Sequence, residues 1–466
     1  MTLQAKSVAI VGGGPVGALA ALYFAHDGWE VNVYDLRTDP RLEQRTTAST
    51  GKSINLALSH RGIEGLRGAS PGLANMVMKH VVPVYGRMIH DRHGRLTSQA
   101  YDVHGEHINA VDRGWLNNVL LEEAEKSSGG KVKIHFGHQL MQCDFHSRQL
   151  KFMTADGEVD VRADLVVGAD GAHSAVRRQL MRVARVDFEQ KYIDTLWCEI
   201  SIPPAHVPST KEETYPLDPH HLHIWPRKTF MLMSLANIGD DKSFTGTLFM
   251  PQANFDDIVY PLDVVDFFKS YFPDVVPLIG EENLVKQFFQ NPKGSLMSVK
   301  CSPYHYLDRC ILIGDAAHAM VPFYGQGMNC GFEDVQRLFE LIRTTNSMTT
   351  ALSQYTTTRK ADLFAISDLA MANYVEMRST VTSRLYLARK TTEELLYKYV
   401  PQLQIRTLYN MVSFSSTPYS IALRRSMWQG KMFSGLCIGT GLGLVGAASY
   451  GVYRFRKVFR NLISSD

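Results

Sequence analysis

Cysteine is scarce in this chain of 466 residues, and its six cysteines are scattered without a C-x-x-C pair. Their spacing offers neither a disulfide framework nor a cysteine metal site, and it is typical of a reducing compartment. An excess of charge is also lacking, because the formal net charge is only +3 and no basic stripe with interleaved aromatic residues occurs. Nothing therefore points to a nucleic-acid partner.

The chain also lacks internal repeats and long low-complexity tracts. The first expected strand begins at about Ser7, which leaves no room for a signal peptide. With 45% hydrophobic and 20% charged residues, the composition is that of a globular protein, and the length suggests two or three structural units.

What the chain does have near its start is a nucleotide-binding pattern. Gly12, Gly14 and Gly17 follow an apolar run and have the G-x-G-x-x-G spacing of a strand, a tight turn and a helix. Gly12 permits the turn, Gly14 lets a pyrophosphate approach, and Gly17 lets the helix over residues 18–26 pack closely. A second strand ends on Asp35, whose carboxylate suits a ribose diol and repels a 2′-phosphate. We expect FAD or NAD rather than NADP here; the alternative is a purely structural turn.

Two later strands also end on acids. One ends in an Asp-Gly pair at Asp170, and Ser174 begins a basic helix directly after it. The other delivers Asp315, and a glycine loop at residues 325–329 then opens a long helix from about Cys330. Asp315 suits the sugar-chain hydroxyls of a dinucleotide, and the loop amides suit the electron-rich end of a flavin ring.

Period-two alternation marks residues 230–236 and 244–250, with a short turn between them. We expect two arms of an antiparallel sheet with one apolar face. Further strands are expected at 54–58, 87–90, 96–101, 132–136, 139–145 and 150–154, and helices ending near Leu66 and over 115–124.

The three motifs, in this order, resemble those of the FAD-dependent aromatic hydroxylases, which are single-component flavoprotein monooxygenases. Within that group the chain is similar to the kynurenine 3-monooxygenase family from about Val8 to Phe414, most clearly at residues 51–61, 222–227, 322–329 and 373–378. The resemblance implies an α/β fold with a Rossmann-type FAD-binding domain interleaved with an antiparallel-sheet substrate domain, plus a helical C-terminal region. The pattern of the last residues adds one expected transmembrane helix. The implied boundaries are 1–182 and 301–345 for FAD binding (with substrate-side insertions near 83–110), 183–300 for the substrate domain, 346–431 for the helical cap, 432–453 for a membrane anchor and 454–466 for a basic tail.

The resemblance also assigns residues to two ligands. Beside the glycines Gly12, Gly14 and Gly17, its FAD contacts fall on Val16, Tyr34, Asp35, Leu36, Arg37, Ala57, Arg113, Leu140, Asp170, Asp315, Met328 and Asn329. Its clamp for the amino-acid end of kynurenine falls on Arg87, Tyr101, Asn373 and Tyr409, with Glu376 at the same pocket. The aromatic end would lie against Leu222, Met233, Leu235, Thr247, Phe249, Pro322 and Phe323. The part played by Tyr324 stays open, because the family varies at that position.

The implied reaction converts L-kynurenine to 3-hydroxy-L-kynurenine, in tryptophan degradation toward quinolinate and NAD. NADPH reduces the flavin, O₂ adds to give a C4a-hydroperoxide, and its distal oxygen goes to the ring carbon ortho to the substrate's amino group. Because that amino group donates electrons, no nucleophile, protein base or metal is expected. The clamp residues act by positioning, and the site must exclude water. The sequence contains no second nucleotide fold that would indicate where NADPH docks.

Simpler interpretations of the clamp residues remain. Arg87 suits a surface ion pair, and Tyr101 and Tyr409 suit an amphipathic core. Asn373 and Glu376, three positions apart, suit a solvated helix face, although the apolar stretch around them argues against it.

Histidines offer two further candidates. His220, His221 and His223 are clustered, but no carboxylate or cysteine completes a metal set. His318 follows Asp315 closely and could be taken for a base, although packing or capping the turn is the simpler role.

The last stretch has its own pattern. Residues 432–453 contain no charged residue and are long enough to cross a hydrocarbon core of about 30 Å as a helix. Basic residues flank the stretch, and Gly435, Gly439 and Gly443 form a smooth face suited to helix contact and self-association. We expect a tail anchor in the mitochondrial outer membrane with the enzyme facing the cytosol; the alternative is a helix packed on the catalytic unit.

Alternatives of other classes are also open. Another FAD aromatic hydroxylase or a flavin halogenase shares much of the fold, although neither the expected lysine near the flavin nor a W-x-W-x-I-P block of a halogenase is found. A non-catalytic FAD-fold escort protein shares the first glycine pattern, but it gives no reason for Asp315 or the loop at 325–329.

Overall fold

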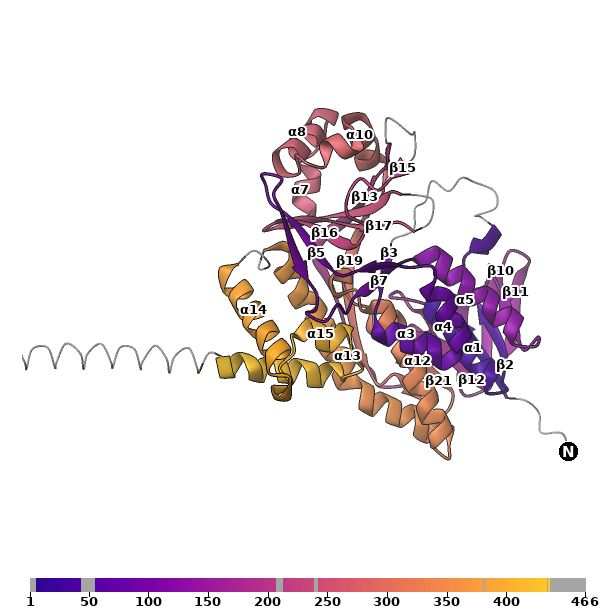
Figure 1. Cartoon of the computed structure of the whole chain (residues 1–466). Helices are drawn as coiled ribbons and strands as arrows, with labels where there is room; N and C mark the ends of the chain where they lie inside the picture. The colour runs from indigo at the N-terminus through magenta and orange to yellow at the C-terminus, as the bar shows by residue number, and fades with distance from the viewer. Residues whose placement is uncertain are drawn as a thin grey trace, which may run out of the picture.

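A mostly parallel sheet carries the nucleotide-binding pattern (Figure 1). The computed structural model describes residues 6–42, 55–206, 213–238, 242–379, 381, 383–433 and 435. The sheet has the order β20-β21-β12-β1-β2-β8, with all neighbours parallel except β20 and β21. Its strands are β1 (Ser7–Val11), β2 (Glu30–Tyr34), β8 (Val132–His135), β12 (Leu165–Gly168), β20 (His305–Tyr306) and β21 (Cys310–Leu312). Because β1, β12 and β21 are neighbours, the three strand ends singled out in the sequence meet at one edge.

Helices cover this sheet and are buried accordingly. Helix α1 (Pro15–His26) packs against α5 (Arg113–Ser127) and α12 (Gly327–Thr344), and it is apolar nearly all round because it is buried on most sides. The neighbouring helices are α3 (His60–Ala69), α4 (Pro71–Met78), α6 (Ala175–Val183), α11 (Asp315–His318) and the 3₁₀ turn η1 (Pro322–Tyr324). Small antiparallel sheets join β3 (Asn55–Leu58), β7 (Ile108–Asp112) and β4 (Val82–Val84), and β11 (Gly157–Arg162), β10 (Gln149–Thr154) and β9 (Gln139–Asp144).

A larger sheet stands beside the first and is mainly antiparallel. Its order is β19-β13-β18-β17-β16-β5-β6. The strands are β19 (Lys293–Ser302), β13 (Asp187–Ile202), β18 (Phe244–Pro251), β17 (Phe230–Ala236), β16 (His221–Arg227), β5 (Gly86–His90) and β6 (Leu96–Ala100). The exception is β5, which pairs in parallel with β16, so a hairpin from the first part of the chain joins the sheet. The two-residue strands β14 (Ala205–His206) and β15 (Glu213–Thr214) pair separately.

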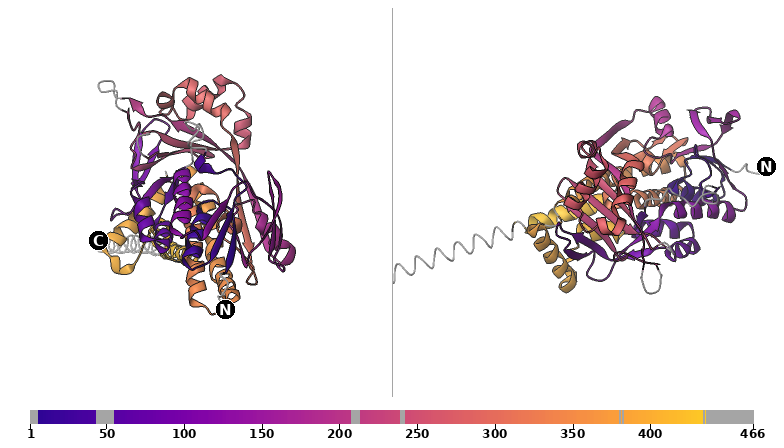
Figure 2. Two further views of the ribbon diagram at one scale, coloured as in Figure 1. Left: turned by 90° about the vertical axis from the view of Figure 1, so that its right-hand side faces the viewer. Right: turned by 90° about the horizontal axis from the view of Figure 1, so that it is seen from above.

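The two faces of the larger sheet serve different cores. One face turns toward the first sheet, and the other packs under α7 (Gln252–Asp256), α8 (Pro261–Tyr271), α9 (Val276–Ile279) and α10 (Glu281–Gln290) as a second hydrophobic core. The views in Figure 2 agree with Figure 1 that these helices cap the outer side of the sheet. Because side chains alternate along a strand, neighbouring residues of β16 such as Ile224 and Trp225 belong to different cores.

The C-terminal part is helical. It consists of α13 (Met348–Arg378), α14 (Arg384–Tyr399), the 3₁₀ turn η3 (Pro401–Leu403) and α15 (Leu408–Ser413). Helix α13 contacts α12, η1 and strands of both sheets. It therefore connects the nucleotide-binding edge to the larger sheet.

Most expected elements are confirmed within a residue or two, including the antiparallel pair β17 and β18. The helix expected from Cys330 begins earlier, at Gly327. The predicted membrane helix at 432–453 lies outside the described residues, apart from Met432, Phe433 and Gly435. Among the helices that the structure describes, none combines the length and the apolar character needed to span a bilayer.

Candidate active site

One cavity of about 610 Å³ lies between the strand ends of the first sheet and the inner face of the larger sheet. It gathers most residues that the sequence assigned to the two ligands. From the FAD set it is lined by Gly12, Gly14, Val16, Tyr34, Asp35, Leu36, Arg37, Ala57, Arg113, Leu140, Asp170, Asp315 and Met328. From the substrate set it is lined by Arg87, Tyr101, Leu222, Met233, Leu235, Thr247, Phe249, Pro322, Phe323 and Tyr409. Gly17, Asn329, Asn373 and Glu376 do not line it.

The glycine turn has the geometry that its spacing predicts. Gly12 has φ +107°, and a Cβ there would lie 2.3 Å from the Ala169 carbonyl oxygen. A Cβ on Gly17 would lie 1.9 Å from the carbonyl oxygen of Gly12, so helix and strand approach closely only without a side chain. Gly14 lines the cavity, and a Cβ there would meet no protein atom within 4 Å. It would occupy space open to a ligand.

Asp35 at the end of β2 is held as a carboxylate. It accepts hydrogen bonds from the Gly13 amide at 2.8 Å and from Arg37 Nε and Nη2 at 3.0 and 2.8 Å. Burial raises the pKa of Asp35, but these hydrogen bonds and the Arg37 charge outweigh it and lower the pKa below its usual value. An ionised acceptor therefore faces the place expected for a ribose.

Asp170 and Asp315 stand at the other two strand ends. Asp170 Oδ2 accepts from the amides of Ala175 and Val176 at 2.6 and 3.1 Å, while Oδ1 has no partner in the described chain. Burial raises the pKa of Asp170. Asp315 opens into the cavity, and lost hydration raises its pKa against the lowering influence of His318 and Arg113. Both groups have acceptor capacity left for a ligand hydroxyl or amide.

Asn329 lies behind the cavity wall. Its Nδ2 donates to the carbonyls of Ala57 and Gly325 at 2.6 and 2.7 Å, and its Oδ1 accepts from the Ser59 amide at 2.8 Å. It ties β3 to the loop before α12, whose first residues, Gly327 among them, line the cavity. The N-terminus of α12 is thus presented to the ligand space.

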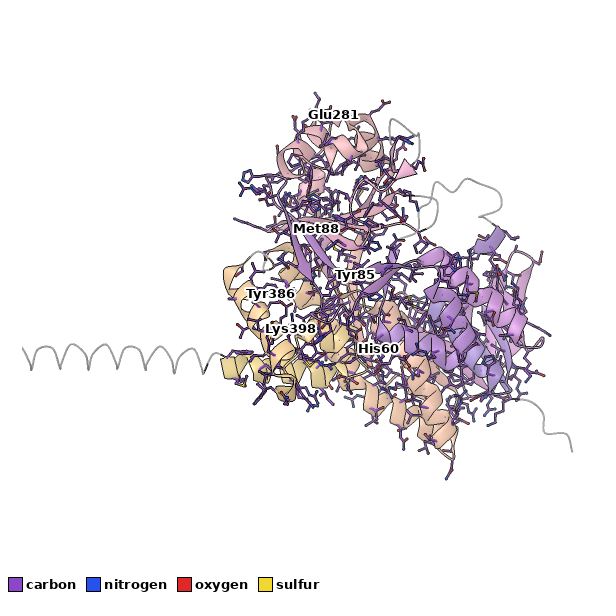
Figure 3. The ribbon with its side chains drawn as sticks, viewed as in Figure 1. His60, Tyr85, Met88, Glu281, Tyr386 and Lys398 are labelled. Carbon is purple, nitrogen blue, oxygen red and sulfur yellow. The ribbon has the colours of Figure 1, made fainter. Side chains whose placement is uncertain are left out.

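Arg87 of β5 lies at the other end of the cavity and is 6% exposed. Its Nη1 pairs with Glu376 Oε1 at 2.9 Å, and its guanidinium carbon lies 5.3 Å from the ring centre of Tyr409 and 5.8 Å from that of Tyr101. Arg87 Nε and the Tyr101 hydroxyl are buried and have no hydrogen-bond partner in the described chain. Tyr386, labelled in Figure 3, donates to Glu376 Oε1 at 2.9 Å.

An apolar wall faces this charged end. Along β16, β17 and β18 the alternating residues Leu222, Met233 and Thr247 point to the same face as Arg87, as the pairing registers require. Phe249 and Phe323 close the wall with ring centres 4.9 Å apart in an edge-to-face arrangement. The cavity therefore has one charged end and one apolar end.

Asn373 of the predicted clamp and Glu376, which was assigned to the same pocket, line a second cavity of about 240 Å³. Arg87, Tyr101, Tyr324 and Tyr409 line both cavities and separate them. Asn373 Nδ2 donates to the Phe323 carbonyl at 2.6 Å, so it fixes the η1 turn. Tyr324, whose part the sequence left open, stacks toward Tyr409 with ring centres 5.8 Å apart.

Several lining residues escaped the sequence interpretation. His173 and Arg178 follow the Asp-Gly pair, and Gln326 and Gly327 belong to the predicted glycine loop. Their position beside these motifs is the sequence signal that could have indicated them. His138 and Gln139, Met320 and Met377 also line the cavity, and no sequence signal marks them.

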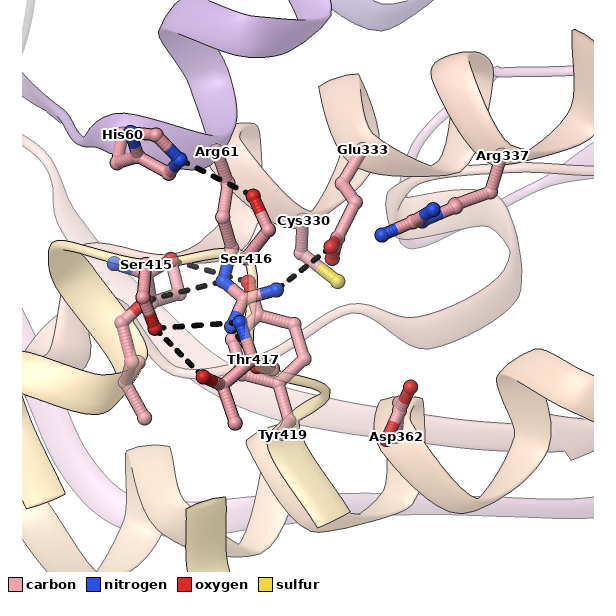
Figure 4. Close-up of polar contacts among 12 residues, drawn as sticks. His60, Arg61, Cys330, Glu333, Arg337, Asp362, Ser415, Ser416, Thr417 and Tyr419 are labelled. Atoms are coloured by element: carbon pink, nitrogen blue, oxygen red, sulfur yellow. Dashed lines mark hydrogen bonds and ion pairs between the residues drawn. The ribbon is translucent and has the colours of Figure 1, made fainter. Parts of the chain in front are cut away.

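A buried ion network supports the loop side of the site, and Figure 4 shows its pair of Arg61 with Glu333 beside Tyr419. Arg61 pairs with Glu333 at 2.6 Å and lies 3.9 Å from the ring centre of Tyr419, and Arg359 pairs with Glu333 at 3.1 Å and with Asp334 at 2.8 Å. These contacts join α3, α12 and α13 to the segment after α15.

Within the described residues, one set of side chains lies close enough to hold a metal, namely His318, Cys330 and Asp334. The His318 imidazole bonds Asp334, and the Arg359 guanidinium already neutralises that carboxylate. Burial raises the pKa of Cys330 well above its usual value, so its sulfur is a thiol. We interpret the set as part of the structural network, in which His318 packs against α12.

Known proteins and a protein family match most of this chain in sequence. A model of the FAD binding domain family matches residues 5–365. Kynurenine 3-monooxygenase of Aspergillus fumigatus is 44% identical over 97% of this chain and 92% of its own, and that of Candida albicans is 45% identical over 96% of each.

Solved structures share the fold at lower identity. The 2-methyl-3-hydroxypyridine-5-carboxylic acid oxygenase is 19% identical with a TM-score of 0.64, covering 83% of this chain and 96% of its own. PqsL of P. aeruginosa, solved with 2-aminobenzoylacetate, is 20% identical with a TM-score of 0.61, covering 81% and 97%.

Proposed function

This chain belongs to the kynurenine 3-monooxygenase family, and from that membership we propose that it is a flavoprotein that hydroxylates L-kynurenine to 3-hydroxy-L-kynurenine. FAD is the cofactor, and NADPH and O₂ are the co-substrates. The observation that carries the proposal is one cavity that joins a dinucleotide cradle to a charged end and an apolar wall.

The residues present fit FAD. Gly14 leaves room at the pyrophosphate position, Asp35 offers an ionised acceptor for the ribose, and Asp170 Oδ1 is a buried acceptor without a protein partner. The N-terminus of α12 directs free amides and a positive dipole end at the position expected for the flavin's electron-rich edge. When bound, FAD supplies the redox chemistry, since it accepts electrons from NADPH and reacts with O₂.

The charged end fits the amino-acid part of kynurenine. Arg87 Nε and the Tyr101 hydroxyl are two orphaned donors in one cavity, and a carboxylate would satisfy both. Burial raises the pKa of Tyr101, so its phenol stays protonated and donates. Glu376 balances the Arg87 charge from the second cavity. A zwitterion is the ligand that suits this neutral pair.

The apolar end orients the ring and keeps water away. Leu222, Met233, Thr247, Phe249 and Phe323 offer no charge to the aromatic part. The substrate's own amino group activates the ring, so the protein needs to position the ring carbon and exclude solvent rather than move a proton.

The test is product analysis of the purified full chain with kynurenine, tryptophan and anthranilate offered in parallel. We expect yellow protein, NADPH oxidation stimulated by kynurenine alone of the three, and 3-hydroxykynurenine by mass spectrometry. A chlorinated product would favour the halogenase, and colourless protein unable to take up FAD would favour the escort protein.

We further propose that residues 432–453 anchor the protein in the mitochondrial outer membrane with the catalytic part facing the cytosol. The uncharged apolar stretch, its basic flanks and its glycine face support this topology and self-association. Deleting residues 432–466 should release the enzyme from membranes, whereas deleting only 454–466 should not. A truncated protein that still sediments with membranes would contradict the anchor.

A further inference from the structure

Two histidines lie side by side on the face of the larger sheet opposite the cavity. His90 Nε2 of β5 is 2.8 Å from His223 Nδ1 of β16. At one end His90 Nδ1 is 2.7 Å from Asp274 Oδ2, and at the other His223 Nε2 is 2.8 Å from the backbone oxygen of Asp218. Both imidazoles are 1% exposed. Three hydrogen bonds therefore form a continuous chain from Asp274 to Asp218.

The number of protons that these three hydrogen bonds need determines the charge of the hydrogen-bonded chain. Both of its ends, the Asp274 carboxylate and the Asp218 carbonyl, are acceptors, so the three hydrogen bonds need three protons. Two neutral imidazoles supply only two, whichever tautomers they adopt. One excess proton is therefore required to complete the chain.

That proton belongs on the imidazoles rather than on the carboxylate. An unperturbed imidazole holds a proton to about pH 6.5 and an aspartate only to about pH 3.9. Burial raises the pKa of Asp274, but hydrogen bonds from His90 and from Trp225 Nε1 at 2.8 Å outweigh it and lower the pKa. Burial lowers the pKa of His223 to about 4, which disfavours a second charge on the pair.

The other charges around the pair are already engaged. Arg227 Nη1 donates to the His90 carbonyl at 3.0 Å and Nη2 to the Asp91 carbonyl at 3.2 Å. The Asp218 carboxylate pairs with His221 at 2.7 Å. The charged and titratable groups facing the pair are Asp274, Asp218, His221, Arg227, Asp91 and Arg92. Among these groups, Asp274 is the one whose charged side chain is hydrogen-bonded to an imidazole of the pair.

Strand geometry connects this chain to the ligand cavity. Arg87 pairs in register with Leu222, and both point into the cavity, while Met88 pairs with His223. Met88, labelled in Figure 3 on β5, and His90 point to the opposite face under α7–α10 because side chains alternate. The histidine chain therefore connects the end of the strand that carries Arg87 to β16 and to the segment between α8 and α9.

We propose that His90 and His223 share one excess proton opposite the Asp274 carboxylate, and that this charged chain positions strand β5 so that Arg87 meets the substrate carboxylate. His90, His223 and Asp274 are positioning residues, because none of them lines the cavity. Only the kinetic consequence rests on the proposed function; the charge of the pair does not.

The charge is tested on the FAD-loaded full chain in detergent with ¹⁵N-labelled histidine. At about pH 7.5, where unperturbed imidazoles are mostly neutral, we expect one ring with both nitrogens protonated, identified by its disappearance in His90→Gln. Asp274→Asn should remove that signal, since the amide then supplies the third proton. The exposed-carboxylate control Asp266→Asn should keep it. Two neutral rings in the wild type, or a charged ring persisting in Asp274→Asn, would overturn the proposal.

The positioning role is tested by separating KM from kcat. His223→Gln can still accept from His90 and donate to Asp218, so it should leave the KM for kynurenine within about two-fold of wild type. His223→Leu removes two of the three hydrogen bonds and should raise KM about ten-fold with a smaller change in kcat, because it displaces the carboxylate clamp. An unchanged KM in His223→Leu, or an equal loss in His223→Gln and His223→Leu, would overturn it.

Discussion

Replacing Arg87 with methionine tests the carboxylate clamp directly. The side chain offers the orphaned Nε donor and a positive charge to the cavity, and it is only 6% exposed to solvent. A hydrogen bond to a charged group contributes about 1.5–3 kcal/mol, so losing Arg87 should cost about 3 kcal/mol of kynurenine binding, or about 100-fold in KM. Glu376 keeps its bond from Tyr386 and is a third exposed, so it can rehydrate and the fold should persist.

The assay compares kynurenine with kynuramine, which lacks the carboxylate. Arg87→Met should raise the KM for kynurenine about 100-fold and change the KM for kynuramine by less than about three-fold. The fraction of NADPH that ends as hydrogen peroxide should rise, since a misplaced ring is not hydroxylated. Arg95→Met, at an exposed arginine just before β6, is the matched control, and flavin absorbance checks the fold. An equal loss for both substrates would refute the reasoning.

Three further outcomes follow from the packing. Gly12→Ala should cost about 2 kcal/mol or more and abolish FAD retention, measured by flavin absorbance, whereas Gly105→Ala, also at positive φ but with open space, should keep it. Arg61→Met should lower the free energy of unfolding by about 3 kcal/mol in urea titrations, because it leaves a buried carboxylate short of one partner, while Arg67→Met at an exposed site should not. Because burial lowers the pKa of His223 from 6.5 to about 4, the unfolded chain binds more protons in that window, so stability should fall by up to about 3 kcal/mol as pH drops through it, and His223→Gln should flatten the profile.

The sequence predicts the cofactor side well because its constraints are local. The Gly12 turn, the strand before it and the acid at Asp35 lie within one βαβ unit, and their spacing alone defines their geometry. The alternation in β17 and β18 likewise predicts one apolar face, because period two is a property of each strand.

The substrate side depends on contacts between distant segments, which no local pattern encodes. The parallel pairing of β5 with β16 brings Arg87 beside Leu222, and α13 brings Glu376 to Arg87 from 289 positions away. Asn373, which the family resemblance assigned to the clamp, lines the second cavity beside Arg87 and bonds the Phe323 carbonyl of η1. The clustered histidines, considered above as an incomplete metal set, have separate partners. His223 is hydrogen-bonded to His90, and His221 pairs with Asp218.

Strand β5 carries Arg87 on the cavity face and His90 on the opposite face. Contacts of His90 can therefore affect the position of Arg87 although His90 does not contact the substrate. A bound carboxylate is satisfied only if Arg87 Nε and the Tyr101 hydroxyl both reach it, and catalytic geometry tolerates displacements of about 0.5 Å. Hydrophobic packing under α7–α10 resists compression but is not directional. The register of β5 is fixed by its backbone pairing with β16 and β6, and the directional, charge-assisted hydrogen bonds at His90 add to that restraint. The position of Arg87 is therefore determined partly by a proton on the far face of the sheet, and substitutions in the second core should alter substrate affinity before they alter flavin binding.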